Sequence, residues 1–225
     1  MEKPIFPSNY MRITQGYMEG SHQDSYAIDN ADKDGGISNL YAPFTGIIKK
    51  IYPNDANEVW LESENVVEYP DGTKDYMTMM FAHANDIQNL FVGKRLRQKE
   101  VFYKEGTKGN ATGNHCHIEC GRGKFTGNGW HKNKAGYWSI NNSKKPEECL
   151  WIDETINILD NHNYLFKKIS TEVVDKPKEL EKAPIEEQKE IKAPEKDNKT
   201  FIAPKTDLYG VYLKEKQKII IEELS

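Results

Sequence analysis

Two histidines separated by one residue are the feature of this sequence best suited to chemistry. His115 and His117 flank Cys116 in the run Asn114-His-Cys-His-Ile-Glu-Cys120. If this run is a strand, alternate side chains share a face, so the two imidazoles point the same way and Cys116 points away. Two imidazoles on one rigid face suit a metal ion or an acid–base pair. An isolated His-x-His can also be a pair of half-exposed histidines with no chemical role.

Further candidate groups lie upstream of this pair. His22 is followed seven positions later by Asp29, which ends an alternating run and should therefore sit on a strand. His83 closes the strand-like run 75–83. We expect these side chains on strands or at strand ends, where a rigid scaffold can hold a catalytic constellation. Three glycines within residues 106–114 predict a tight loop that brings the backbone close to another group.

Short strands must position these residues. β-branched and aromatic runs occur at 45–52 and 58–62, and Tyr69-Pro-Asp-Gly-Thr73 is a turn signal that predicts a hairpin between 65–69 and 75–83. No convincing long amphipathic helix precedes residue 150. The sequence therefore predicts a mainly β fold, with an antiparallel, sandwich-like sheet and long loops. Residues 153–168 fit either one helix or a pair of strands.

Composition changes at about residue 170. Residues 1–170 contain all four tryptophans and all six histidines, and we assign the β domain to them. Residues 171–200 are charged, contain repeated proline and lack aromatic residues. They predict a disordered linker, because such a segment buries too little surface to offset chain entropy. Residues 201–225 contain two short apolar runs and are predicted to be a short docking segment, such as a hairpin.

Charge and hydropathy exclude several classes of protein. The 225 residues include 31 basic and 35 acidic side chains, a net charge of −4, which argues against nucleic-acid binding through phosphate contacts. No apolar run approaches the roughly 20 residues of a membrane span, so no membrane insertion is expected. The first 20 residues lack a basic-then-apolar signal, and synthesis in the cytoplasm without a signal peptide is expected. Three cysteines without a CxxC pair argue against a disulfide framework.

The order of the candidate residues resembles that of the lysostaphin/LytM-type zinc endopeptidases, peptidase family M23. The histidines and Asp29 follow one another as in that family, and the surrounding motifs are similar too. These motifs are Arg12-Ile-Thr-Gln-Gly-Tyr17, Tyr41-Ala-Pro-Phe-Thr-Gly-Ile-Ile48, and Thr112-Gly-Asn-His-Cys-His-Ile-Glu119, which follows a glycine-containing segment. The resemblance covers roughly residues 10–120 and is closest to the version found in phage endolysins of low-GC Gram-positive hosts.

The resemblance implies zinc-dependent hydrolysis of peptide bonds in peptidoglycan. It assigns one Zn²⁺ to His22, Asp29 and His117, and gives His115 and His83 the acid–base and oxyanion-stabilising roles. General chemistry agrees, because a catalytic zinc keeps three protein ligands and one open position. No HExxH helix supplies a glutamate, so histidines outside the ligand set must move the proton.

The chain departs from the family pattern in one place that matters for the metal. The family usually spaces its first ligands as His-x-x-x-Asp, whereas His22 and Asp29 are seven positions apart. Asp24 is therefore a rival ligand. We prefer Asp29 because the preceding Ala-Ile matches the family's apolar context. Asn114 and Cys116 replace the usual Pro and Leu, and neither change removes a ligand.

Other readings of the same residues remain open. Cys116 and Cys120 could hold a structural zinc with His115, but Cys116 should face away from His117. A thiol peptidase would require a cysteine at a helix N-terminus, which is not predicted. The chain could also be a catalytically silent peptidoglycan-binding or activator module with the same fold. An intracellular metal-binding protein is a third, weaker reading.

The segment 121–151 is rich in Gly, Asn and aromatic residues and supplies candidates for substrate binding. Trp130, Tyr137 and Trp138 could contact peptide or sugar in a cleft wall, or could pack on the β core under a long loop. The resemblance implies stem or cross-bridge peptides as partners and export of a monomer through a holin. Residues 201–225 would then assist binding to the wall. The bond that is cut is not indicated.

Overall fold

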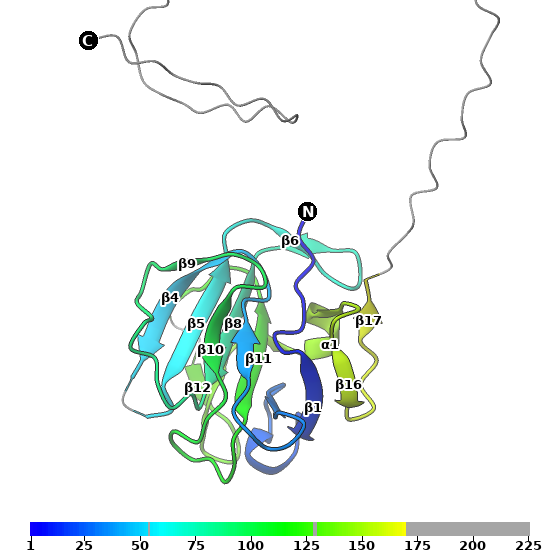
Figure 1. The fold of residues 1–225 in the computed structure, drawn as a ribbon. Helices are drawn as coiled ribbons and strands as arrows, with labels where there is room; N and C mark the ends of the chain where they lie inside the picture. The colour runs from blue at the N-terminus through cyan, green and yellow to red at the C-terminus, as the bar shows by residue number, and fades with distance from the viewer. Residues whose placement is uncertain (54, 128–129, 170–225) are drawn as a thin grey trace, which may run out of the picture. The chain divides into compact units, whose positions relative to one another are not determined.

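A twisted sheet forms the framework of the protein in the computed structural model, which describes residues 1–53, 55–127 and 130–169 (Figure 1). Within these residues the sheet has nine strands, of which eight follow the order β16-β1-β2-β11-β8-β5-β4-β9, and the ninth, β14, also pairs with β11. All neighbours are antiparallel except β1 and β16. The strands are β1 (Tyr10–Gln15), β2 (Ile28–Asn30), β4 (Gly46–Tyr52), β5 (Glu58–Ser63), β8 (Met77–Ala82), β9 (Arg95–Leu96), β11 (Cys116–Arg122), β14 (Ser143–Lys144) and β16 (Asn157–Asp160).

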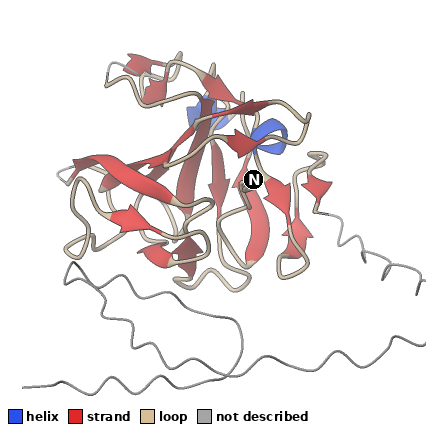
Figure 2. Ribbon diagram, turned by 90° about the horizontal axis from the view of Figure 1, so that it is seen from above, coloured by secondary structure: helices blue, strands red, loops and turns tan. Residues whose placement is uncertain are grey.

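Smaller elements surround this sheet (Figure 2). Four two-stranded pairs join β3 (Asn39–Tyr41) to β10 (Val101–Lys104), β6 (Val67–Glu68) to β7 (Lys74–Asp75), β12 (Trp130–Lys132) to β13 (Trp138–Ile140), and β15 (Trp151–Ile152) to β17 (Lys167–Lys168). The helical elements in the described ranges are the 3₁₀ turn η1 (Gly20–His22) and the single-turn α1 (Pro146–Cys149). The prediction of a mainly β, largely antiparallel fold is confirmed. Among the described residues, no helix is long and apolar enough to cross a membrane.

The central strands are buried on both faces, and the two faces differ. All six residues of β8 are buried. Met79 and Phe81 pack into the main core, whereas Met80 and Ala82 join a smaller cluster with Trp60 on the opposite face. A buried central strand reads as a nearly continuous apolar run, because neither face meets water. The face that carries Met80 and Ala82 is also the face that carries the candidate site.

Two local predictions are corrected by the structure. The predicted hairpin is present at the turn around Gly72, whose φ is 84°, but it consists only of the short strands β6 and β7; the rest of its expected second strand, β8, pairs with β5 and β11 in the main sheet. Residues 153–168 form neither one helix nor a mutual strand pair. They contribute β16, which pairs with β1, and β17, which pairs with β15 just before this segment. The predicted linker 171–200 and terminal segment 201–225 lie outside the described residues.

Candidate metal centre and pocket

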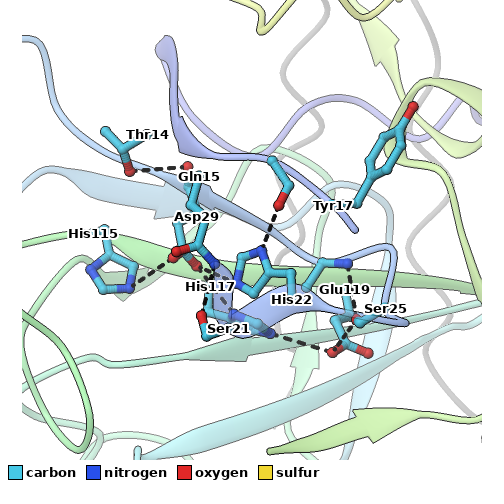
Figure 3. Close-up of polar contacts among 12 residues, drawn as sticks. Thr14, Gln15, Tyr17, Ser21, His22, Ser25, Asp29, His115, His117 and Glu119 are labelled. Atoms are coloured by element: carbon cyan, nitrogen blue, oxygen red, sulfur yellow. Dashed lines mark hydrogen bonds and ion pairs between the residues drawn. The ribbon is translucent and has the colours of Figure 1, made fainter. Parts of the chain in front are cut away.

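Two neighbouring strands and one turn bring together the three residues expected to bind metal. Asp29 is the central residue of β2, and His117 is the second residue of β11. The two strands are antiparallel and place these residues directly opposite each other. His22 ends η1 and therefore lies on a 3₁₀ turn. The sequence had predicted a strand or a strand end for this residue. One ligand atom from each residue lies within 4.8 Å of the others (Figure 3).

The two imidazoles converge on one carboxylate oxygen. His117 Nδ1 lies 3.1 Å from Asp29 Oδ1, and His22 Nε2 lies 3.3 Å from the same atom. The two rings stand nearly perpendicular, with centroids 4.8 Å apart. Asp29 is 9% exposed and His22 is 2% exposed. A carboxylate oxygen and two imidazole nitrogens are donors that zinc accepts, and a three-residue set leaves a fourth position open.

In the trio of His22, Asp29 and His117, each histidine also makes a contact through the ring nitrogen that does not face Asp29. His22 Nδ1 donates a hydrogen bond to the carbonyl oxygen of Gly16, at 3.0 Å. His117 Nε2 lies 3.4 Å from Oε1 of the buried Glu119. Metal-binding histidines usually have such an outer partner on the nitrogen that does not face the metal. The donor set and its supporting contacts therefore fit a divalent zinc ion.

The electrostatics of the trio favour a cation between these residues. Burial would raise the pKa of Asp29, but hydrogen bonds from His117 and His22 hold it well below its usual range. Burial would lower the pKa of His117, but hydrogen bonds to Asp29 and Glu119 raise it to about 10. The carboxylate is therefore ionised, and His117 holds a proton between Nδ1 and Asp29. A metal ion binding at this place must displace that proton.

His83 and His115 lie next to the trio. Their ring centroids are 4.6 Å apart, and His115 Nε2 is 3.6 Å from Asp29 Oδ2. His115 Nδ1 donates to the carbonyl of Gly113 and His83 Nδ1 to the carbonyl of Lys108, each at 2.8 Å. Burial and the nearby His117 lower the pKa of His83 to about 4, so this ring is neutral at pH 7. Nδ1 of each ring carries a proton because it donates to a carbonyl, and in the neutral ring of His83 this leaves Nε2 as an acceptor.

The predicted tight loop connects these two histidines. Gly106 exchanges backbone hydrogen bonds with His115, of 3.1 and 3.2 Å. A Cβ on Gly106 would lie only 2.5 Å from the carbonyl oxygen of His83 and 2.6 Å from the backbone nitrogen of Asn85. Glycine at this position therefore allows the loop to pass close to the end of β8. The loop sets the spacing between His83 and His115.

All five of these residues line one pocket of 360 Å³. Two acidic side chains that the sequence did not single out, Asp55 and Glu58, lie on its wall. Burial raises the pKa of Glu58 to about 7, with a smaller contribution from nearby carboxylates. Among the described lining residues there is no lysine or arginine, so the wall is acidic apart from the histidines. Side chains alternate along β5, so Glu58 lies on the same face as Trp60. The sequence alone did not indicate that this face borders the site, because that depends on strand pairing.

Two of the three aromatic candidates for substrate binding reach this pocket. Tyr137 and Trp138 line it and are 44% and 55% exposed. The Tyr137 hydroxyl accepts a 2.7 Å hydrogen bond from Asn110, which joins this wall to the Gly-rich loop. Trp130 lies on β12 opposite Ile140, and its side chain is outside the described part of the structure.

The rival ligands lie elsewhere. Asp24 has a φ of 70°, is exposed, and its carboxylate lies 3.7 Å from Lys134 Nζ, outside the group that could bind metal. Cys116 and Cys120 are fully buried in the main core, on the opposite face of β11 from His117. As the alternation predicted, the thiols point away from the candidate metal site.

Comparison with known sequences finds relatives that match part of the chain. No family model matches the chain. Morphogenesis protein 1 of Bacillus phage B103 is 32% identical over 147 residues, which are 64% of this chain and 36% of the phage protein. The chain thus spans about a third of the length of this relative.

Solved structures with a similar backbone include two peptidases. The catalytic domain of lysostaphin, an antimicrobial peptidase from Staphylococcus simulans, matches with a TM-score of 0.40 and 17% identity over 60% of this chain and 86% of that domain. A zinc-containing peptidase from Vibrio cholerae matches with a TM-score of 0.37 and 18% identity over 51% of this chain and 36% of the other. This similarity is too low to support a statement about function. The side chains of the pocket are the observation that bears on it.

Proposed function

We propose that this protein is a zinc-dependent endopeptidase that hydrolyses peptide bonds of bacterial cell-wall peptidoglycan. The observation that carries the proposal is the convergence of His22, Asp29 and His117 in one pocket that also contains His83 and His115. Three zinc donors next to two further imidazoles are the groups that peptide hydrolysis requires.

His22, Asp29 and His117 would hold the zinc ion. When bound, zinc supplies Lewis acidity, which activates water and polarises the scissile carbonyl. The protein contributes the geometry, because Asp29 and His117 are fixed by the β2–β11 pairing and His22 by the carbonyl of Gly16.

Proton transfer falls to His115 and His83. Nδ1 of each ring donates to a backbone carbonyl, so Nε2 is the nitrogen left to exchange a proton. One of the two takes a proton from the attacking water. The imidazolium so formed is a donor, and it can stabilise the developing oxyanion or pass the proton to the leaving amine.

The motifs shared with cell-wall peptidases support peptidoglycan peptides as the substrate class, and Tyr137 and Trp138 offer apolar surface at the edge of the pocket. We place the activity in a phage context because the partial relative is a phage protein. The name of that relative refers to morphogenesis, whereas the resemblance in the motifs points to an endolysin released through a holin.

The proposal is tested on the full chain with purified cell walls of known chemistry. We expect one zinc per chain and new amino termini in the released fragments, which mass spectrometry assigns to a bond. His117→Ala should lose zinc and release together. A catalytically silent binding module would instead sediment with the walls and release no amino groups. Wild-type protein that binds no zinc, or that releases no new amino termini when loaded with zinc, would contradict the proposal.

A further inference from the structure

We infer that Glu119 is a positioning residue that fixes the orientation and the tautomer of His117. The inference rests on the proposed zinc site, because it concerns which nitrogen of His117 faces the metal. Glu119 lies two residues after His117 on β11, so both side chains point to the same face of the sheet. The carboxylate is 1% exposed.

The groups that contact the two oxygens of the Glu119 carboxylate at hydrogen-bonding distance can all donate to it. Oε1 lies 2.7 Å from Ser139 Oγ and 3.2 Å from Ser25 Oγ. Oε2 accepts a 2.7 Å hydrogen bond from the backbone nitrogen of Ile140. A buried carboxylate with such partners is held as an acceptor. His117 Nε2, 3.4 Å from Oε1, must therefore carry a proton to make a favourable contact (Figure 3).

This contact determines the other nitrogen of the ring. In a neutral imidazole one nitrogen is a donor and the other an acceptor, so a proton on Nε2 leaves a lone pair on Nδ1. Nδ1 is the atom that faces Asp29 and the candidate metal position. Without a metal, the 3.1 Å contact with Asp29 also holds a proton on Nδ1; once a metal displaces that proton, the contact with Glu119 keeps the remaining proton on Nε2 and leaves Nδ1 to the metal.

The same carboxylate joins three parts of the site. Ser25 belongs to the loop between His22 and Asp29, while Ser139 follows Trp138 on β13. Through Glu119, the ligand loop and the aromatic wall are tied to the strand that carries His117. Fixing a ligand through a buried outer partner is how proteins keep a metal site in its binding geometry before the metal arrives.

Glu119→Gln is the sharpest variant, because it keeps the shape but replaces one oxygen by a donor. If the amide oxygen faces Ile140 N–H, the amide NH₂ faces His117 and favours the tautomer with the proton on Nδ1. If the oxygen faces His117, the NH₂ meets Ile140 N–H and two donors oppose each other. Either arrangement weakens the metal-binding form of His117. Glu62→Gln is the matched control, because it makes the same exchange at a carboxylate that accepts a 2.6 Å hydrogen bond from the backbone nitrogen of Phe125 and lies outside the pocket lining.

The experiment measures zinc affinity of the full chain by competition with a chromophoric chelator. We expect Glu119→Gln to bind zinc about 10- to 100-fold more weakly than wild type, the range typical of outer metal partners, and Glu62→Gln to stay close to wild type. Thermal unfolding in EDTA checks that both variants fold. Equal affinity of Glu119→Gln and wild type, or an equal loss in both variants, would overturn the inference and leave the proposed function standing. Wild type that binds no zinc would overturn both.

A measurement on wild type keeps the inference testable even if Glu119→Gln does not fold. Long-range ¹H–¹⁵N spectra of the zinc-loaded protein report the state of each histidine ring nitrogen. We expect His117 to show zinc on Nδ1 and a slowly exchanging proton on Nε2. Zinc on Nε2, or a protonated Nδ1, would contradict the role of Glu119.

Discussion

His117 and Asp29 face each other across the pairing of β11 with β2, with Nδ1 of the histidine 3.1 Å from Oδ1 of the aspartate. Backbone hydrogen bonds of the two strands fix this pair, although 88 positions separate the residues in the sequence. His22 is held differently, by a turn whose backbone nitrogen at His22 donates to the Glu19 carbonyl at 2.7 Å and by the bond of its ring to the Gly16 carbonyl. Asn133 also donates to the carbonyl of the preceding Ser21, at 2.8 Å. The candidate metal centre therefore combines one strand pair with one hydrogen-bonded turn.

Asp29→Asn should abolish high-affinity zinc binding. The substitution keeps the size of the side chain but removes the charge on which both imidazoles converge. We expect a loss of affinity larger than the roughly 10- to 100-fold that follows from removing an outer partner. Isothermal titration with zinc, or competition with a chelator, measures the change.

Asp24→Asn is the control for this prediction and also tests the rival ligand. Its carboxylate lies near Lys134 on the exposed side of the loop, away from the two histidines. Zinc affinity should therefore stay at the wild-type value. A large loss in Asp24→Asn with little change in Asp29→Asn would show that the ligand assignment is wrong.

Replacing His83 or His115 by alanine should separate catalysis from metal binding. Neither residue belongs to the trio of candidate ligands, and both line the pocket. We expect zinc content to be retained and kcat/KM for wall hydrolysis to fall by about 10²- to 10⁴-fold, as is typical of general acid–base groups. The double variant should lose little more than the worse single variant if the two rings act as a unit. Full activity of either single variant would remove that residue from the proposed mechanism.

The sequence predicted the parts of the site that depend on local pattern. Alternation on one strand placed Cys116 in the core and left His117 on the other face, and it placed Asp29 on β2. It failed for His22, because the turn there requires positive φ angles at Met18 and Gly20 that a strand pattern does not reveal. Turns of this kind are set by a few backbone hydrogen bonds and not by periodicity.

Features that depend on strand pairing were beyond the sequence. Glu58 borders the pocket only because β5 pairs with β8, which pairs in turn with β11. The short strand β16 pairs in parallel with β1, more than 140 positions away, so neither alternative considered for residues 153–168 describes it. Such pairings are non-local and leave little trace in a single sequence.

Glu58→Gln should stabilise the protein at alkaline pH. The pKa of Glu58 is raised by burial to about 7, from an ordinary value of 4.5, so the folded protein holds this proton more tightly than the unfolded chain. Its stabilising contribution is fully present below about pH 4.5 and is lost as the pH rises through about 7. At pH 8 the variant, which never ionises, should therefore be more stable than wild type by up to about 3 kcal/mol.

Urea denaturation at pH 4.5 and pH 8 measures this difference, in EDTA so that no metal charge acts on the carboxylate. The change in stability between wild type and variant should grow with pH. Glu154→Gln, at an exposed turn position, serves as the control and should give the same small difference at both pH values. A pH-independent difference for Glu58→Gln would show that the carboxyl group is not held protonated in the folded protein.

Two glycines of the loop before His115 give a matched pair for testing how the backbone holds the catalytic histidines. A Cβ at Gly106 would clash with the His83 carbonyl at 2.5 Å, whereas a Cβ at Gly113 would meet nothing within 4 Å. Gly106→Ala should therefore lower the free energy of unfolding by about 1–3 kcal/mol, as overpacking does, and should reduce wall hydrolysis by moving His83 relative to His115. Gly113→Ala should change neither. Equal behaviour of the two variants in urea denaturation and hydrolysis assays would show that the close approach of the loop to β8 does not set the spacing of the two rings.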